Sequence, residues 1–469
     1  MSQRQVIVIG AGPGGYVSAI RAAQLGAKVV LVEREKVGGT CLNRGCIPTK
    51  SILSDVKLIR SFKRSPIFRA LSHEKFNPLE DIMKHKEQVV RDMVKGVDML
   101  LESYGITLKY AYANSLGDKH VELLFKEGRK ETLEGDLIIL APGSKAKSVP
   151  GISPDGERII TSDEALEITK IPPTLLVVGG GYIGVEFATI FNALGSKVTI
   201  VELMENILPG LEEEVTRNLR RLLERDGINV FTRSGIEEID DAGESLKVAV
   251  KTPQGIKTLL ADKVLLAIGR VPNLDFEIST AGLGVCSEGI RVNSRMETSA
   301  SGIYAIGDVV GGVMLAYVAS EQGIVAAENA MGLDRQMEDQ PVPLCVFTNP
   351  EVATIGLTEK EAREKEHIRI GRFPFRSNPK ALLSGETEGL IKVIASQDTN
   401  QLLGVHVIGP DAGLLVSVAS AIMNQGGRIK DFSRLIQPHP TSLEALKEAF
   451  LDVDGLAIHV PRTHRESTG

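Results

Sequence analysis

The feature that most constrains the fold is a pattern of strand, glycine turn, helix and strand that the chain contains twice. In the first copy, an apolar run over residues 6–9 leads into a glycine-rich turn over 10–15 and a helix-forming stretch over 16–25. A second apolar run, 28–32, ends at Glu33. Short apolar runs of this kind are typical of parallel strands that are buried on both faces. The pattern therefore predicts a β-α-β unit with the glycine turn at its centre.

The second copy repeats the pattern with the same spacing. It consists of an apolar run, a glycine turn, a helix-forming stretch, a second apolar run and an acidic residue, at 175–178, 179–184, 185–194, 197–201 and Glu202. Each acidic residue follows the first glycine of its turn by 23 positions (33 − 10 and 202 − 179). Equal spacing in two distant segments indicates two nucleotide-binding folds of related architecture.

Both turns have the G-x-G-x-x-G arrangement of a dinucleotide site. The first glycine allows a tight turn, the second lets the backbone approach a pyrophosphate, and the third lets helix and strand pack closely. The helix N-terminus offers N–H groups to the phosphates, and the acidic side chain accepts hydrogen bonds from ribose hydroxyls. The predicted ligands are Gly10, Gly12, Gly15 and Glu33 at the first site and Gly179, Gly181, Gly184 and Glu202 at the second. Two turns that bind nothing are disfavoured because strand, turn, helix and acid all occur twice.

The order of the units suggests which nucleotide each binds. A cysteine pair soon after the first unit favours FAD at the first site and a nicotinamide nucleotide at the second. The second site should prefer NAD to NADP, because a 2′-phosphate would meet the charge of Glu202. Residues 203–208, which follow, contain no arginine that could compensate this charge.

The two halves also end alike, and this sets the domain organisation. Residues 135–144 resemble residues 261–270, each segment follows hairpin-like sequence, and Gly269 is assigned to the NAD site. Beyond about residue 341, alternating stretches indicate an antiparallel sheet with flanking helices. The expected fold is α/β, with two Rossmann-like dinucleotide-binding domains plus a C-terminal α+β domain. The expected boundaries are 1–147 and 271–342 for the FAD-binding domain, 148–270 for the NAD-binding domain and 343–469 for the C-terminal domain.

Of the four cysteines, Cys41 and Cys46 are the pair that lies close in sequence. Their C-x4-C spacing is not usual for zinc, and no metal site is predicted. In a regular helix, residues five apart are separated by ~7.5 Å along the axis, whereas a disulfide needs Cα atoms roughly 4.4–6.8 Å apart. The segment must therefore be irregular, which Gly45 permits. Lys50 would favour a thiolate at Cys46, and two buried thiols without redox function are the alternative.

His439 is the best candidate for a base that works near neutral pH. Oxidation of a dithiol removes protons from groups whose pKa is ~8.5 or above, so such a base is useful. His439 lies just before an amphipathic helix. Thr441 and Glu444 fit a capping box, so a turn histidine followed by a capping glutamate is the alternative.

Charge and hydropathy argue against two classes of partner. The net charge is −6 over 469 residues, which offers no basic surface for nucleic acid or an anionic membrane. No apolar run reaches the ~18–20 residues of a membrane span. Residues 3–5 lead into the first strand without a signal peptide, so a cytoplasmic protein is expected.

With these motifs in place, the chain resembles the FAD-dependent pyridine nucleotide–disulfide oxidoreductases, and among them most closely the dihydrolipoamide dehydrogenases. The resemblance spans essentially the whole chain. It rests on G-G-T-C-L-N at residues 38–43, on Y-A-I-G-D at 304–308, and on His439-Pro-Thr with Glu444 five residues further on. The resemblance implies that protein-bound dihydrolipoyl groups are oxidised through a redox disulfide and FAD, while NAD+ is reduced to NADH.

The resemblance also implies roles around the flavin. Cys41 would exchange with the substrate, and Cys46 would contact the flavin as a thiolate. Lys50 would lie beside the flavin and pair with Glu186, which opens onto the nicotinamide site. These four residues would form the redox centre.

The resemblance also implies further contacts to FAD, a homodimer and a partner protein. Asp308 would bind the ribityl chain of FAD, and the helix that begins near Ala316 would point its N-terminus at the flavin. Residues 343–469 would form a homodimer, in which His439 acts on the partner subunit's cysteine pair while Glu444 holds the imidazole. The implied partner is a lipoyl carrier protein of a 2-oxoacid dehydrogenase or glycine-cleavage system.

A few positions depart from the family pattern. Gln437 and Tyr317 stand where members often have histidine, and Pro142 stands where they often have threonine. Gln437 bears on the entrance for the dithiol and hence on the substrate. Two alternative functions follow: a glutathione-type reductase, which would want basic residues for NADP, and a flavoprotein NAD(H) sensor, which would not need an intact cysteine pair.

Overall fold

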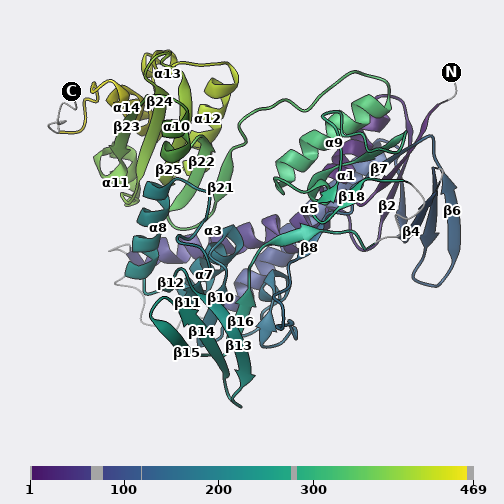
Figure 1. The fold of residues 1–469 in the computed structure, drawn as a ribbon, viewed down its shortest axis with the longest axis horizontal. Coiled ribbons are helices and arrows are strands. Elements are labelled where there is room, and N and C mark those ends of the chain that lie inside the picture. Colours follow the sequence, from purple (N-terminus) through teal and green to yellow (C-terminus); the bar gives the residue numbers. More distant parts are fainter. Residues whose placement is uncertain (1–2, 65–77, 118, 276–281, 462–469) are drawn as a thin grey trace. The chain divides into compact units, whose positions relative to one another are not determined.

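The computed structural model of the chain describes residues 3–64, 78–117, 119–275 and 282–461. These residues form two compact units (Figure 1). The first unit comprises Met1–Asp55, Pro66–Lys170 and Ile268–Asp339. The second comprises Val56–Ser65, Ile171–Ala267 and Gln340–Gly469. The chain therefore leaves the first unit and returns to it.

The first unit is built on a parallel sheet with strand order β20-β7-β1-β2-β3. Its strands are β1 (Gln5–Ile9), β2 (Lys28–Glu33), β3 (Thr107–Tyr110), β7 (Leu137–Leu140) and β20 (Ile303–Ala305). Val6, Ile7 and Val8 in β1 are fully buried, as the apolar run predicts. Because β1 lies in the middle of the sheet, the glycine turn after it lies at the centre of the sheet edge.

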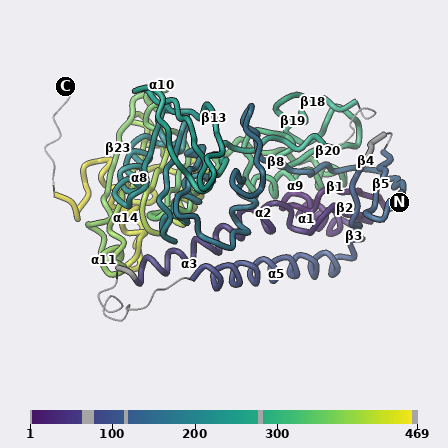
Figure 2. Tube along the Cα trace, turned by 90° about the horizontal axis from the view of Figure 1, so that it is seen from below, coloured from purple at the N-terminus to yellow at the C-terminus, as the bar shows by residue number. Residues whose placement is uncertain are grey.

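Two helices pack closely against each other in this unit. They are α1 (Pro13–Gln24) and α9 (Ala316–Ala330), which lie side by side in Figure 1. A Cβ atom at Gly323 would lie 2.6 Å from the carbonyl oxygen of Gly14, so glycine is required for this approach. The long helix α5 (Leu79–Ser103) is uninterrupted and contacts α1 (Figure 2).

Smaller elements complete the first unit. An antiparallel sheet, β4 (Tyr112–Gly117), β5 (His120–Leu124) and β6 (Lys130–Glu134), precedes β7, as the hairpin-like sequence predicts. Strand β8 (Ser144–Ala146) pairs antiparallel with β17 (Arg270–Pro272). The short elements are α2 (Gly39–Arg44), α6 (Ser162–Ala165), η1 (Gly307–Val310), β9 (Ile159–Ile160), β18 (Val285–Cys286) and β19 (Gly289–Ile290). Helix α3 (Cys46–Arg64) begins in this unit.

The second unit contains the second glycine turn. Parallel strands follow the order β12-β11-β10-β16, and an antiparallel sheet β13-β14-β15 precedes β16. The strands are β10 (Thr174–Val178), β11 (Lys197–Val201), β12 (Asn229–Phe231), β13 (Gly235–Asp241), β14 (Leu246–Thr252), β15 (Gly255–Ala261) and β16 (Lys263–Leu266). The helices are α7 (Tyr182–Leu194) and α8 (Glu213–Arg225). The two predicted β-α-β units are thus confirmed.

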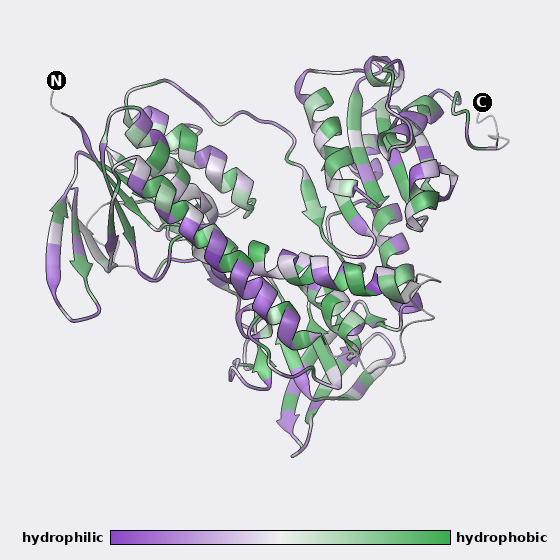
Figure 3. Cartoon of the chain, turned by 180° about the vertical axis from the view of Figure 1, so that it is seen from behind, coloured by the Kyte–Doolittle hydropathy of each residue, from purple (hydrophilic) through white to green (hydrophobic). Residues whose placement is uncertain are grey.

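The end of the chain forms an antiparallel sheet with strand order β21-β22-β25-β24-β23. Its strands are β21 (Leu344–Val346), β22 (Glu351–Gly356), β23 (Ile368–Pro374), β24 (Leu390–Ser396) and β25 (Leu402–Gly409), and they are largely hydrophobic in Figure 3. The accompanying helices are α10 (Glu359–Lys365), η2 (Phe375–Ser377), α11 (Pro379–Ser384), α12 (Ala412–Asn424), α13 (Ile429–Ser433) and α14 (Leu443–Val453). The core between sheet and helices includes Phe373, Leu415 and Phe450. The predicted α+β domain is confirmed.

Candidate redox and dinucleotide-binding sites

The first glycine turn joins β1 to α1 through backbone that requires glycine. Gly10 has a φ of +96°, and a Cβ atom at Gly15 would lie 1.8 Å from the carbonyl oxygen of Gly10. At Gly12 the nearest protein atom to such a Cβ lies 4.0 Å away, so the protein itself leaves room for a side chain there. Glycine at Gly12 therefore keeps open a space at the N-terminus of α1, where a pyrophosphate would lie.

The second turn repeats this geometry. Gly179 has a φ of +102°, and a Cβ atom at Gly184 would lie 1.9 Å from the carbonyl oxygen of Gly179. A Cβ atom at Gly181 would have no neighbouring atom within 4 Å. Both helices begin without a side-chain cap, so their first N–H groups are available to a phosphate. The residues of both turns fit a dinucleotide.

The two acidic residues bind the glycine turns that precede them. Glu33 accepts hydrogen bonds from the amides of Ala11 (2.8 Å) and Glu35 (2.9 Å). Glu202 accepts hydrogen bonds from the amides of Gly180 (2.6 Å) and Met204 (2.7 Å). Each carboxylate is thereby fixed at the edge of its turn, where a ribose would follow the pyrophosphate.

The cysteine pair meets where a helix is interrupted. Helix α2 ends at Arg44 and α3 begins at Cys46, so the expected irregularity falls at Gly45. A Cβ atom at Gly45 would lie 2.9 Å from the carbonyl oxygen of Thr40 and 3.4 Å from the Cα atom of Cys41. Glycine at this position therefore lets the end of α2 and the start of α3 approach each other.

The two cysteine side chains interact directly. The structure holds them as thiols joined by a hydrogen bond. This hydrogen bond, burial and the charge of Cys46 all raise the pKa of Cys41, while Lys50 opposes the shift. Cys41 thus keeps its proton when Cys46 carries a negative charge. Arg44 lies between the two cysteines in the sequence and is a second cation near Cys46. Its guanidinium forms ion pairs with Glu35 at 2.5 Å and Asp163 at 3.8 Å.

Tyr16 is a neighbour of the pair that the sequence did not identify. Burial, and then the charge of Cys41, raise the pKa of its hydroxyl. Tyr16 is the residue that follows the last glycine of the first turn. A tyrosine at a half-buried helix position gives no signal in the sequence that distinguishes it from a residue that only packs against the core.

Asp308 belongs to a hydrogen-bond network at the carboxyl end of the first sheet. Its carboxylate accepts a hydrogen bond from the Ser144 hydroxyl at 2.5 Å. Arg270 donates to that hydroxyl (2.7 Å) and to the carbonyl oxygen of Ser144 (2.8 Å). Pairing of β8 with β17 brings Ser144 and Arg270 together, so the similar segments 135–144 and 261–270 end side by side. Helix α9 begins at Ala316, as expected.

Glu186 is 4% exposed and lies on α7. Its carboxylate accepts a hydrogen bond from the amide of Phe347 at 2.9 Å. Lys50 belongs to the first unit and Glu186 to the second, so their predicted pairing stays a prediction.

His439 and Glu444 are brought together at the start of α14. The Nδ1 atom of His439 lies 2.9 Å from one carboxylate oxygen of Glu444, and the other oxygen accepts a hydrogen bond from the Thr441 amide at 2.8 Å. Glu444 therefore orients the imidazole and supports the turn before the helix at the same time. Burial would raise the pKa of Glu444, but these two hydrogen bonds outweigh burial and lower the pKa. The imidazole itself is 67% exposed.

A second pair of the same kind follows on the same helix. The Nδ1 atom of His459 lies 3.0 Å from Glu448, and the amides of Ile458 and His459 donate to the other Glu448 oxygen at 2.8 Å and 3.0 Å. Glu448 lies one turn after Glu444. The sequence did not identify this pair, because its two members come from a helix and from the segment beyond it.

Among the residues that the structure describes, one group of carboxylates lies close enough together to hold a cation. Glu212, Glu214 and Glu359 form this group, and the Lys392 ammonium lies 2.6 Å, 3.1 Å and 2.6 Å from them, respectively. An ammonium group therefore already lies among these carboxylates. Among the described helices, we find none with the length and apolar character of a membrane span.

Two family models match the chain. The model of the pyridine nucleotide-disulphide oxidoreductases matches residues 4–323, and the model of their dimerisation domain matches residues 342–450. The chain is 39% identical over 461 residues to a dihydrolipoyl dehydrogenase of Bacillus subtilis, covering 96% of this chain and 99% of the relative. It is 40% identical over 466 residues to the dihydrolipoyl dehydrogenase of Thermus scotoductus, covering 98% and 99%.

Other similar proteins have different names. A leghemoglobin reductase of Glycine max is 37% identical over 461 residues, covering 95% of this chain and 87% of the relative. Among solved structures, the HOCl-induced flavoprotein disulfide reductase RclA from Escherichia coli has a TM-score of 0.86 at 27% identity, covering 96% and 99%. LpdA from Mycobacterium tuberculosis has a TM-score of 0.87 at 24% identity, covering 95% of this chain and 99% of LpdA. At this identity the similarity supports the fold alone.

Proposed function

The chain belongs to the pyridine nucleotide–disulphide oxidoreductase family, and from this premise we propose that Cys41, Cys46 and His439 carry the chemistry of the active site. The protein is an FAD-dependent, NAD-linked enzyme that oxidises dihydrolipoyl groups and reduces NAD+ to NADH. The observation that supports the assignment of residues is the hydrogen-bonded meeting of Cys41 and Cys46 at the break between α2 and α3.

The proposed reaction starts from the oxidised enzyme, in which a disulfide bond joins Cys41 and Cys46. In its first step, one thiol of the substrate loses its proton to His439 and attacks the sulfur of Cys41. The Cys41–Cys46 bond breaks, and Cys46 leaves as a thiolate. The second substrate thiol then attacks the first substrate sulfur, which closes the substrate disulfide, and its proton goes to Cys41, which is released as a thiol. Cys46 is suited to the role of leaving thiolate because it is the first residue of α3, where the helix dipole stabilises negative charge.

The residues that would hold the cofactors are those of the two glycine turns. FAD would lie at Gly10, Gly12, Gly15 and Glu33, with Asp308 and the N-terminus of α9, and NAD at Gly179, Gly181, Gly184, Glu202 and Gly269. The open space at Gly12 and Gly181 supports this assignment. When bound, the flavin supplies two-electron transfer between the cysteine pair and NAD. Lys50 is proposed to lie beside the flavin and to pair with Glu186, which would open onto the nicotinamide site.

A homodimer with a shared active site is part of the proposal. The match of residues 342–450 to a dimerisation domain supports it. His439 would act on the partner subunit's cysteines, while Glu444 fixes which ring nitrogen accepts the proton. We place the enzyme in the cytoplasm, where a reducing environment suits a catalytic cysteine pair. Its substrate would be a lipoyl group on a carrier protein of a 2-oxoacid dehydrogenase or glycine-cleavage system.

A substrate panel on the purified enzyme tests the function. We expect NADH formation from dihydrolipoamide and NAD+, and little reduction of oxidised glutathione with NADH or NADPH. Robust glutathione reduction without dihydrolipoamide turnover would replace the proposal with a glutathione-type reductase. A flavoprotein that turns over no disulfide would instead indicate an NAD(H) sensor.

A further inference from the structure

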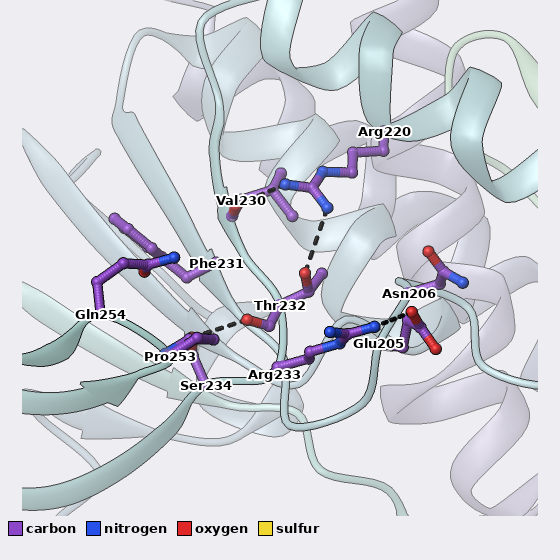
Figure 4. Close-up of a pocket in the computed structure, with 10 residues that line it drawn as sticks. All are labelled: Glu205, Asn206, Arg220, Val230, Phe231, Thr232, Arg233, Ser234, Pro253 and Gln254. Carbon is purple, nitrogen blue, oxygen red and sulfur yellow. Dashed lines mark hydrogen bonds and ion pairs between the residues drawn. The ribbon is translucent and has the colours of Figure 1, made fainter.

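A cavity of about 410 Å³ lies in the second unit, at the segments that follow β11 and β12 (Figure 4). Its walls come from β12, from the segments that follow β11 and β12, from α8 and from the turn between β14 and β15, and they include Glu205, Asn206, Arg220, Thr232 and Arg233. The carboxyl ends of parallel strands are where such sheets bind nucleotides. The cavity therefore lies next to the position at which the adenosine ribose of NAD is expected.

Backbone hydrogen bonds tie this cavity to Glu202. The amide of Ser234 donates to the carbonyl oxygen of Glu202 at 2.9 Å, and the amide of Arg233 donates to that of Met204 at 2.8 Å. Glu202 is itself fixed to the glycine turn by its carboxylate. Arg233 is consequently held alongside the residue that should contact the ribose, although it lies 31 positions later in the chain (233 − 202).

Both guanidinium groups on the cavity are paired with a carboxylate. Arg233 forms an ion pair with Glu205, drawn as a dashed line in Figure 4. Arg220 donates to Glu224 at 2.9 Å and to the Thr232 hydroxyl at 3.2 Å. The side chains of Arg233 and Glu205 are 63% and 67% exposed, and an exposed ion pair of this kind contributes little to stability. Arg233 can therefore exchange its partner easily.

We propose that Arg233 is a latent ligand for a 2′-phosphate and that Glu205 withholds it, so that Glu205 acts with Glu202 to set the preference for NAD over NADP. This inference rests on the proposed NAD site. A guanidinium binds a phosphate through two parallel hydrogen bonds, and this interaction is stronger than a hydrogen bond between neutral groups. A carboxylate at position 205 both occupies the guanidinium and repels the phosphate. Residues 203–208 contain no arginine, but the segment that follows β12 supplies one, Arg233, to the same cavity.

The test measures binding of two coenzyme fragments to the holoenzyme by calorimetry. The fragments are adenosine 2′,5′-bisphosphate and 5′-AMP, which differ by the 2′-phosphate alone. For Glu205→Gln we expect the bisphosphate to bind about tenfold more tightly, because one charge-assisted hydrogen bond is gained, while 5′-AMP changes less than about twofold. The ratio of kcat/KM for NADPH to that for NADH should rise by a similar factor.

A second variant assigns the effect to Arg233. Adding Arg233→Gln to Glu205→Gln should abolish the gain in bisphosphate binding. The matched control is Glu213→Gln, which removes a carboxylate from an exposed ion pair with Arg217 on α8 and lies outside the cavity lining. It should leave the binding ratio unchanged.

Three results would overturn the inference. They are an unchanged ratio in Glu205→Gln, a gain that survives removal of Arg233, and an equal gain in Glu213→Gln. Fragment binding is independent of the dithiol reaction, so loss of the dihydrolipoamide assignment would leave these measurements valid. Failure of every variant and of the wild type to bind 5′-AMP would refute the NAD site and this inference together.

Discussion

Cys46 combines two influences that favour a negative charge on its sulfur. It is the first residue of α3, and Lys50 follows one helical turn later. The raised pKa of Cys41 agrees with a negative charge on Cys46 and a proton on Cys41, because the largest cause of the shift is the hydrogen bond between the two side chains. At the scale of single residues, the two sulfurs are therefore not equivalent.

Replacing the proposed leaving thiolate tests this asymmetry. Cys46→Ser should lose reduction of the flavin by dihydrolipoamide and still bind FAD, because Cys46 lies outside the glycine turn. The absorbance spectrum of the purified variant, recorded before and after addition of dithiol, reports both properties. Cys286→Ser is the control, since Cys286 hydrogen-bonds to the Gly289 carbonyl oxygen and has no place in the proposed reaction. Retained dithiol reduction in Cys46→Ser would contradict the assignment.

The carboxylate of Glu444 is expected to work through His439. Glu444→Gln should lower kcat by about 10²-fold, because the imidazole loses the charge that orients it and stabilises its protonated form. The acidic limb of the pH–rate profile should move to lower pH for the same reason. The lowered pKa of Glu444 means that its support is present above the ordinary value of 4.5 and is lost as the pH falls through the lowered pKa.

Helix α14 itself provides the matched control for this prediction. Glu448 lies on α14 one turn after Glu444 and contacts His459, which lies beyond the helix, and Glu448→Gln removes its carboxylate. If Glu444 only supported the helix, the two variants would have the same pH profile. We expect the profile of Glu448→Gln to remain that of the wild type.

Residues next to each other in the chain were the easiest to predict. The spacing of Cys41 and Cys46, and that of His439 and Glu444, is local, and the structure brings each pair together. Arg233 could not be found in this way, because its contact with Glu205 spans two strands of a sheet. A local pattern carries no information about which loops meet at a sheet edge.

At the scale of elements, the break between α2 and α3 depends on one glycine. Gly45→Ala would place a Cβ atom 2.9 Å from the Thr40 carbonyl oxygen, so the two segments must move apart. We expect a loss of roughly 1–3 kcal/mol in the free energy of unfolding, and slower reduction by dithiol because the sulfurs separate. Denaturant unfolding and rapid-mixing absorbance measure the two effects.

Gly96→Ala is the control, because it makes the same glycine-to-alanine change at a position where the added Cβ atom meets no neighbour. Gly96 lies inside α5, and a Cβ atom there has no neighbour within 4 Å. Alanine at this position should stabilise the protein by roughly 0.5–1 kcal/mol through helix propensity, without a change in activity. A Gly45→Ala variant that behaved like Gly96→Ala would show that the break does not need glycine.

Element types followed well from periodicity, and element ends followed less well. The strands predicted at residues 6–9 and 197–201 are Gln5–Ile9 and Lys197–Val201. The helices predicted at 16–25 and 185–194 begin three residues earlier in each case, at Pro13 and Tyr182. They do so because the helical backbone starts directly after the second glycine, and G-x-G-x-x-G does not indicate where inside the motif the turn ends.

At the scale of the whole molecule, a buried ammonium joins parts that are distant in the sequence. Lys392 on β24 is 1% exposed and contacts Glu212 and Glu214 at the start of α8 and Glu359 at the start of α10. Within the second unit, it therefore links the nucleotide-binding fold to the C-terminal sheet. The 180 positions between Glu212 and Lys392 explain why the sequence did not reveal this cluster.

Removing this ammonium should strongly destabilise the second unit. Lys392→Met should cost roughly 3–5 kcal/mol, because three neighbouring carboxylates lose the buried ammonium that they share, and Arg372 contacts Glu214 and Glu359 but not Glu212. Lys251→Met is the control, since that side chain is 72% exposed, and it should stay within about 0.5 kcal/mol. Thermal unfolding of both variants checks the difference, and similar melting temperatures would show that the cluster does not stabilise the fold.

The same cluster predicts a pH dependence of stability. Burial would raise the pKa of each carboxyl, but the hydrogen bond from Lys392 to each of them lowers it, helped at Glu214 by Arg372 and at Glu359 by Arg363. The contribution of the carboxylates is therefore lost as the pH falls below 4.5. Burial would lower the pKa of Lys392, but the carboxylates raise it, so its contribution is lost only as the pH rises beyond 10.5. The deficit of Lys392→Met should therefore be smaller near pH 4 than near pH 7.

The two glycine turns are built alike, with a left-handed first glycine, an open second position and a third glycine against the carbonyl of the first. FAD and NAD both contain an ADP portion, and two glycine turns with the same backbone geometry provide similar binding sites for it. Compounds that imitate ADP would therefore compete at both places. Selective inhibitors of this enzyme would have to exploit what surrounds each adenosine or what lies beyond the pyrophosphate.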